Sequence, residues 1–150
     1  MLHGDLLHPE ILEAIASARH SSKILIADGN YPFRTRCGPK ARRVHLNLSP
    51  GVISVTQALE ALLSSVPIEA AAVMDYPAEG PYALDADPPI WSEIQSLLQA
   101  SASPCDALQR IERFQFYEAA SGPDVALLIA TADQRIFANL LLTIGVVFPE

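Results

Sequence analysis

The sequence of 150 residues is poor in cysteine and has no long uninterrupted apolar stretch. Its two cysteines, Cys37 and Cys105, lie far apart and neither belongs to a CxxC pair. Neither a zinc site nor a disulfide framework is therefore indicated. No apolar run approaches the roughly 20 residues of a membrane-spanning helix, and Asp5, two histidines and Pro9 make the opening unlike a signal peptide. We expect a cytoplasmic protein that does not enter a membrane.

Basic residues are also scarce, since 10 lysines and arginines face 17 aspartates and glutamates, for a formal net charge of −7. This balance argues against a nucleic-acid partner, which is held by cationic contacts to phosphates. Five cations nevertheless cluster in one stretch: Arg34, Arg36, Lys40, Arg42 and Arg43. A local basic patch suits a small anionic or polyhydroxyl ligand better than a duplex, while solvated loop charge explains it equally well.

Several catalytic signatures are missing as well. The sequence contains no G-x-S-x-G, no G-x-G-x-x-G and no Walker motif. The sequence therefore predicts neither the serine nucleophile of an acyl transferase nor a glycine-rich phosphate loop. We expect no metal and no cofactor.

What is present is an alternation of helix and strand patterns, without an internal repeat or linker. Apolar positions predict strands at residues 23–27, 43–48, 70–74, 125–130 and 139–147, and helices at 9–20, 54–65, 89–99 and 110–120. Residues 75–89, with four prolines and four acids, are predicted to be irregular. We expect the last strand to pair with the preceding one. The pattern predicts a single α/β domain, a layered sheet with helices on both faces.

The segment from His20 to Gly38 turns a hydrophobic strand into a polar, turn-rich loop. Asp28 follows this strand at its carboxyl end, where open α/β sheets bind ligands. His20 precedes the strand, and a histidine can act as acid or base near neutral pH. Two simpler interpretations remain open: His20 as a capping or surface residue, and Asp28 as the cap of the next turn.

Four segments carry a resemblance to a known family: HPEILEAIASARH, ILIADGNYP, IERFQFYEAA and FANLLLTIGV. In order and spacing they resemble the family of L-fucose mutarotases and D-ribose pyranases, over nearly the whole chain. Residues 112–118, 72–74 and 91–93 are more similar to the fucose branch. The resemblance implies a cofactor-independent isomerase that interconverts the anomers of a monosaccharide.

The resemblance also implies roles for individual residues. His20 aligns with the catalytic histidine and Asp28 with the sugar-binding carboxylate. Arg113 aligns with an arginine that reaches a sugar hydroxyl, and Asn139 with the asparagine of a C-terminal motif. The whole motif, Phe137-Ala138-Asn139, is expected to bind the substrate. The family further implies a ring-shaped homo-oligomer, a decamer, in which a neighbouring subunit completes each site.

Three departures from the family pattern bear on activity. Phe137 stands in place of a tyrosine, so any proton transfer or hydrogen bond made by that hydroxyl is either absent or taken over by Tyr31 or Tyr117. The usual Gly-His-Gly-Asp reads Arg-His-Ser-Ser at residues 19–22. The loop after Pro32 carries two additional arginines, Arg34 and Arg36.

Three hypotheses follow from the sequence. The first is a mutarotase acting on fucose or a related sugar. The second is a non-catalytic, transport-associated sugar-binding protein, favoured by Phe137. The third is a phosphosugar or other anion binder, suggested by Arg34, Arg36, Arg42 and Arg43.

Overall fold

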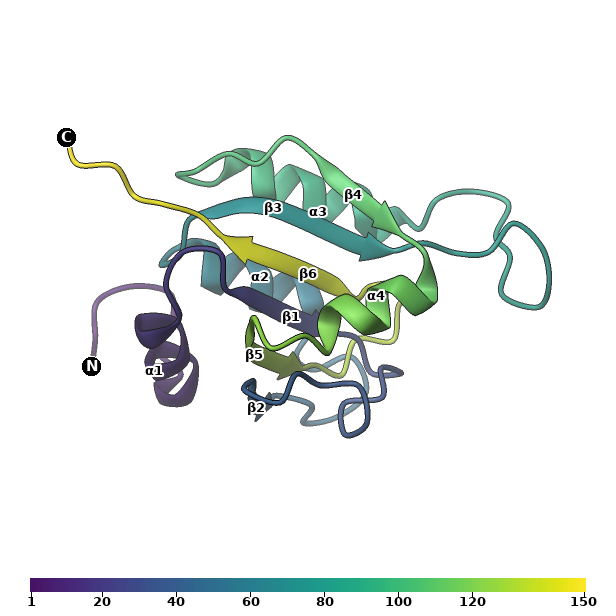
Figure 1. Cartoon of the computed structure of the whole chain (residues 1–150), viewed down its shortest axis with the longest axis horizontal. Coiled ribbons are helices and arrows are strands. Elements are labelled where there is room, and N and C mark those ends of the chain that lie inside the picture. The colour runs from purple at the N-terminus through teal and green to yellow at the C-terminus, as the bar shows by residue number, and fades with distance from the viewer.

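A six-stranded sheet runs through the middle of the chain, and the computed structural model describes all 150 residues (Figure 1). The helices are α1 (Pro9–Ala18), α2 (Val55–Leu63), α3 (Pro89–Ala100) and α4 (Arg113–Ala120). The strands are β1 (Lys23–Ala27), β2 (Arg42–His45), β3 (Ile68–Met74), β4 (Leu108–Ile111), β5 (Val125–Ala130) and β6 (Leu140–Ile144). Their order in the sheet is β2-β5-β1-β6-β3-β4. Only β6 runs antiparallel to its neighbours, so the other five strands end at the same edge.

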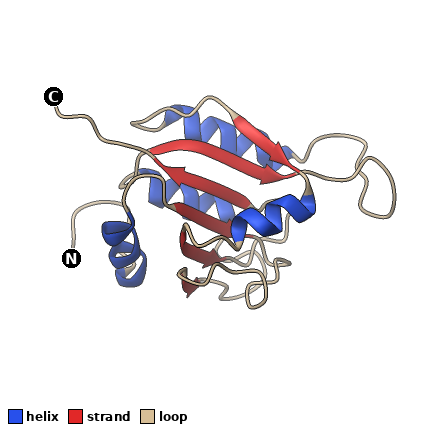
Figure 2. Ribbon diagram, in the orientation of Figure 1, coloured by secondary structure: helices blue, strands red, loops and turns tan.

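Helices cover both faces of the sheet, which confirms the predicted architecture (Figure 2). α1, α2 and α3 pack over one face, in a cluster of 25 buried residues that includes Ile24 and Ile26 of β1. α4 packs over the other face, in a cluster of nine that includes Leu25 and Ala27. Successive side chains of a strand point to opposite faces, so a strand buried on both sides is apolar throughout.

Local signals set the helix starts. Pro9 and Pro89 occupy first-turn positions of α1 and α3, where the missing N–H has no helical partner to lose. At α2, the Ser54 hydroxyl accepts from the Gln57 N–H while the Gln57 side chain accepts from the Ser54 N–H. This reciprocal cap satisfies two backbone donors.

None of the four helices combines the length and apolar character needed to cross a membrane.

The predicted partner of the last strand is wrong. β6 does not pair with β5 but lies between β1 and β3. The segment from Thr131 to Asn139 crosses the end of β1 and is bonded to it: the Thr131 hydroxyl donates to Ala27 O at 2.7 Å, and the Gly29 N–H donates to Asp133 O at 2.8 Å. The chain therefore passes over one strand before it turns back.

Two further boundaries are corrected. Arg110 and Ile111 belong to the edge strand β4, which the sequence did not predict, and helix α4 begins only at Arg113. The Glu112 carboxylate caps that helix by accepting from the N–H groups of Phe114 and Gln115. The strand predicted at 43–48 ends at His45. Beyond it Leu46 still packs against the core, whereas Asn47 and Leu48 are exposed.

Candidate functional site

A pocket of about 450 Å³ opens at the edge of the sheet where β1 and β3 end. It is lined by 11 residues: Asp28, Asn30, Tyr31, Met74, Pro77, Tyr82, Arg113, Tyr117, Ile136, Phe137 and Asn139. These residues follow β1, end or follow β3, belong to α4 and precede β6. The pocket therefore brings together Asp28, Arg113, Phe137 and Asn139 of the predicted site.

Asp28 is the buried acid of this pocket, with only 3% of its surface exposed. Its backbone N–H donates to Asn139 Oδ1 at 2.8 Å, and its Oδ1 accepts from the Asn30 N–H at 2.9 Å. Burial raises the pKa of Asp28 to about 6, although backbone N–H groups of Asn30, Ala138 and Tyr31 oppose the shift. A carboxyl group with such a pKa can give or take a proton near neutrality.

The Phe137-Ala138-Asn139 motif is held in place by a hydrogen bond from α3. Phe137 adopts a left-handed conformation with φ of 54°, and its carbonyl oxygen accepts from Trp91 Nε1–H at 2.8 Å. Ala138 is fully buried. The Asn139 side chain is held by its hydrogen bond to the Asp28 N–H. The motif thus ties the floor of the pocket to the end of β1.

Arg113 sits over the pocket among aromatic rings. Its guanidinium lies 5.6 Å from the ring centre of Tyr82 and 5.7 Å from those of Phe114 and Tyr117. Arg113 makes no ion pair, so its donors are free to bind a ligand. The Tyr117 hydroxyl likewise has no hydrogen-bond partner in the chain, whereas that of Tyr31 donates to Arg36 O. Of the two candidates to replace the missing hydroxyl of Phe137, Tyr117 is the uncommitted one.

His20 lies at the opposite edge of the sheet. It precedes β1, while Asp28 follows it, and five residues at about 3.3 Å each place roughly 16 Å of strand between them. His20 Nε2 lies 3.1 Å from Glu69 Oε2, so a carboxylate orients the exposed ring. Within one chain the structure does not bring His20 to the pocket that holds Asp28.

The backbone around His20 retains a glycine-like shape although glycines are missing. Arg19 has φ of 75° and ψ of −178°, and Ser21 has φ of 66°. These conformations suit glycine better than residues with a Cβ atom. His20 therefore projects from a strained turn, beside the exposed apolar side chains of Val146 and Val147.

Several residues around His20 and around the Asp28 pocket were not predicted from the sequence. Glu69, Tyr82 and Trp91 are not near His20, Arg113 or Phe137 in sequence. Glu69 reaches His20 because β3 and β1 flank β6, and Tyr82 reaches Arg113 because the long loop after β3 bends back. No local sequence pattern predicts these contacts. No group of three or more His, Cys, Asp or Glu side chains is placed to hold a metal ion.

A buried carboxylate, a free guanidinium and aromatic rings around one small cavity define an α/β protein with a site for a small polar ligand. Residues 1–147 match the model of the RbsD / FucU transport protein family, and the chain belongs to this family of sugar mutarotase-like proteins.

Relatives and solved structures agree with this assignment. The chain is 34% identical to the fucose mutarotase of Homo sapiens over 149 residues, which cover 94% of this chain and 90% of the relative. A fucose mutarotase from Streptococcus pneumoniae, solved in complex with L-fucose, superposes with a TM-score of 0.81 at 19% identity and coverage of 99% and 100%. FucU from Bifidobacterium longum gives a TM-score of 0.78 at 29% identity, with coverage of 96% and 99%.

Proposed function

We propose that this protein is a monosaccharide mutarotase acting on L-fucose or a closely related sugar. The observation that carries the proposal is the convergence of Asp28, Arg113 and Asn139 in one pocket, with Phe137 as part of its wall. Relatives at 30–34% identity named fucose mutarotases support the choice of substrate. Hydroxyl groups of a sugar require paired donors and acceptors in a buried site, and these side chains offer both.

The reaction needs a base at the anomeric hydroxyl of the sugar and an acid at its ring oxygen. The base removes the proton of the anomeric hydroxyl while the acid protonates the ring oxygen, so the ring opens to an aldehyde. The carbonyl then turns and the ring closes on its other face, which returns both protons. We assign His20 as one of these groups and Asp28 as a carboxylate that binds the sugar, with a pKa of about 6 that keeps it able to exchange a proton.

His20 would reach the pocket from a second copy of the chain. We propose a ring-shaped homo-oligomer, a decamer, in which the His20 edge of one subunit lies against the pocket edge of its neighbour. The opposite placement of His20 and Asp28 on the sheet supports this arrangement. So does the apolar C-terminal segment beside His20, where Val147 and Phe148 are 76% and 81% exposed.

Anomeric exchange observed by NMR tests the proposal. The purified protein is added to equilibrated L-fucose and, separately, to D-ribose, and the widths of the anomeric resonances are compared with and without protein. We expect broadening with L-fucose. Broadening with D-ribose alone would identify a ribose pyranase instead.

A second function deserves a test because of Phe137. Without the tyrosine hydroxyl the pocket would still bind sugar through Asp28, Arg113 and Asn139, as a non-catalytic monosaccharide-binding protein. Saturation-transfer signals from the sugar, with no gain in anomeric exchange, would show binding without catalysis.

A further inference from the structure

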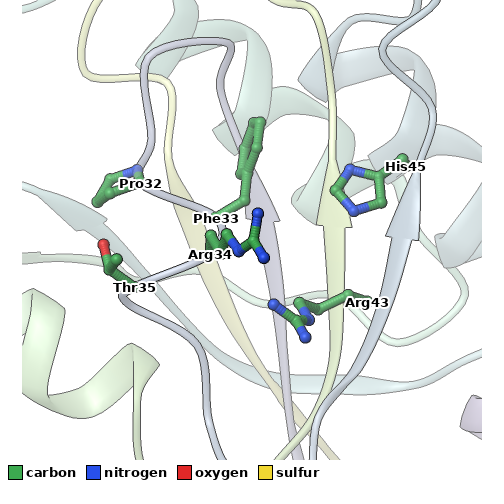
Figure 3. A pocket seen from close by; sticks show the side chains of 6 residues that line it. All are labelled: Pro32, Phe33, Arg34, Thr35, Arg43 and His45. Carbon is green, nitrogen blue, oxygen red and sulfur yellow. The ribbon is translucent and has the colours of Figure 1, made fainter.

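A second pocket, of about 600 Å³, lies between the loop after β1 and the edge strand β2 (Figure 3). It is lined by Pro32, Phe33, Arg34, Thr35, Arg43 and His45. Arg43 and His45 are two residues apart on β2, so their side chains leave the same face of the strand, while Val44 is buried on the other face. Figure 3 shows the side chains of Arg34 and Arg43 reaching toward the same space from the loop and from β2.

The two arginines of this pocket are not neutralised. Three other arginines form ion pairs: Arg42 with Glu10 and Glu13, Arg110 with Asp75 and Asp87, and Arg135 with Asp133 and Glu93. Arg36 and Arg113 lie over aromatic rings. Arg34 and Arg43 have neither kind of partner, and no acid lines their pocket. In a protein of net charge −7 this is a local reversal of sign.

We propose that this pocket binds the phosphate group of a small phosphorylated compound. Two guanidinium groups offer forked donors that match phosphate oxygens, and their charge of +2 matches a phosphate monoester of about −1.5 to −2. The Thr35 hydroxyl adds a further donor. The volume exceeds what a phosphate ion fills, and the Phe33 ring offers the body of the ligand a flat apolar surface.

The phosphate pocket shares no lining residue with the pocket of Asp28, so the proposal stands apart from the mutarotase proposal. The two are nevertheless neighbours along the loop. Phe33 of the phosphate pocket lies 6.2 Å, between ring centres, from Tyr31 of the sugar pocket, and 6.2 Å from the ring of His45. A ligand that contacts Phe33 would therefore lie next to a residue of the proposed sugar pocket.

Titration of the whole chain with inorganic phosphate, followed by NMR at constant ionic strength, tests the proposal. We expect saturable shifts of the Arg34, Thr35 and His45 amide resonances that chloride does not reproduce. The double variant Arg34→Gln/Arg43→Gln should weaken binding about tenfold or more, because charge-assisted hydrogen bonds are lost. Lys40→Gln removes one exposed, unpaired cation outside the pocket and should leave phosphate affinity within about twofold of wild type.

Three results would overturn the phosphate site. They are shifts that never saturate, a double variant that binds phosphate like the wild type, and an equal loss of affinity in Lys40→Gln, which would mean diffuse attraction. Glucose 6-phosphate serves as the second probe. It should bind at least as tightly as inorganic phosphate, and its exclusion would mean that the pocket takes the free ion and no phosphorylated compound. The side chains of Arg34, Arg43 and Lys40 are all exposed, so we expect the variants to fold. A dispersed amide spectrum of each variant verifies this.

Discussion

The Asp28 carboxylate is buried at the end of a core strand with only backbone N–H groups to offset the loss of water. Asp133 is a useful contrast. Burial would raise the pKa of Asp133 too, but hydrogen bonds from Arg135 and from the Val55 N–H outweigh it, and the pKa is lowered. Asp133 thus serves the fold, whereas Asp28 is left without a cation and keeps its acceptor capacity for a ligand.

The raised pKa of Asp28 makes the stability of the protein depend on pH. The folded chain holds this proton up to about pH 6 and the unfolded chain only to about 3.8, so ionisation opposes folding as pH rises through that window. The full effect is about 3 kcal/mol at neutral pH. We expect the free energy of unfolding of Asp28→Asn, relative to wild type, to increase between pH 4 and 7, measured by chemical denaturation.

Asp133→Asn is the matched control for this experiment. The lowered pKa of Asp133 contributes stability that is lost as pH falls through the ordinary aspartate pKa, so the offset of the variant from wild type should stay nearly constant between pH 5 and 7. Parallel curves for wild type and Asp28→Asn would show that Asp28 is not buried as described.

Arg19 is strained by a backbone conformation that only glycine adopts freely. Relief of about 1–3 kcal/mol of strain exceeds the 0.5–1 kcal/mol that glycine's extra chain entropy costs. We expect Arg19→Gly to raise the free energy of unfolding by about 1 kcal/mol, measured by urea denaturation. Arg19→Ala keeps the Cβ atom and should show no gain. Equal stabilities for the two variants would contradict the strain.

Phe137 lacks the hydroxyl of the family tyrosine, and Phe137→Tyr should increase the rate of anomeric exchange. The ring already lines the pocket with Asp28 and Asn139, so a restored hydroxyl would add a hydrogen-bonding group at its wall. Exchange spectroscopy on L-fucose measures the effect. An unchanged rate, together with a loss of exchange in Tyr117→Phe, would show that the Tyr117 hydroxyl had already taken over.

Among the elements, α3 supports the Phe137-Ala138-Asn139 motif through Trp91. Trp91 donates to Phe137 O, while its ring stacks with Tyr76 at 5.7 Å and lies under the guanidinium of Arg110 at 4.8 Å. Arg110 is in turn held by Asp75. This stack joins α3, β4 and the segment after β3 to the motif that precedes β6.

We expect Trp91→Phe to weaken sugar binding several-fold, because Phe137 O loses its donor and the left-handed turn can relax. Leaving a fully buried acceptor unpaired costs about 1–3 kcal/mol, and because Phe137 O is only partly buried this cost is an upper bound on the effect. Calorimetric titration with L-fucose measures it, and Ser92→Ala, on the exposed side of the same helix, is the control. Wild-type affinity in Trp91→Phe would mean that the motif holds its shape unaided.

The sequence predicts the elements that are locally determined and fails where distant segments decide. β1 was predicted with its bounds because a short apolar run is enclosed by turn residues. β4 was missed because a four-residue edge strand with only partial burial shows no clear pattern. The place of β6 depends on hydrogen bonds between its preceding segment and the end of β1, which no periodicity records.

The residues of the candidate site likewise include some that the sequence could predict and some that it could not. Asp28 could be placed from strand polarity, since β1 was recognisable and ligands collect at the carboxyl ends of parallel strands. Its union with Arg113 and Asn139 came from resemblance alone. The Glu69 contact with His20 and the position of Tyr82 follow from sheet order and loop path, so neither was accessible from the sequence.

On the scale of the whole molecule, the two halves of the proposed mutarotase site lie at opposite edges of the sheet of one chain. One half is the pocket of Asp28, and the other is His20 with its carboxylate partner Glu69. A head-to-tail contact repeats the same pairing at every interface and closes into a ring when the rotation allows. The proposed mutarotase therefore depends on its assembly.

The most direct measurement is the rate of L-fucose anomeric exchange in a mixture of two inactive variants. His20→Ala and Asp28→Asn should each lack exchange while keeping their fold. After the two are unfolded and refolded together in equal amounts, random assembly joins an intact His20 to an intact pocket in about a quarter of the interfaces. We expect about a quarter of the wild-type rate. A mixture no faster than the separate variants would contradict a site built from two chains.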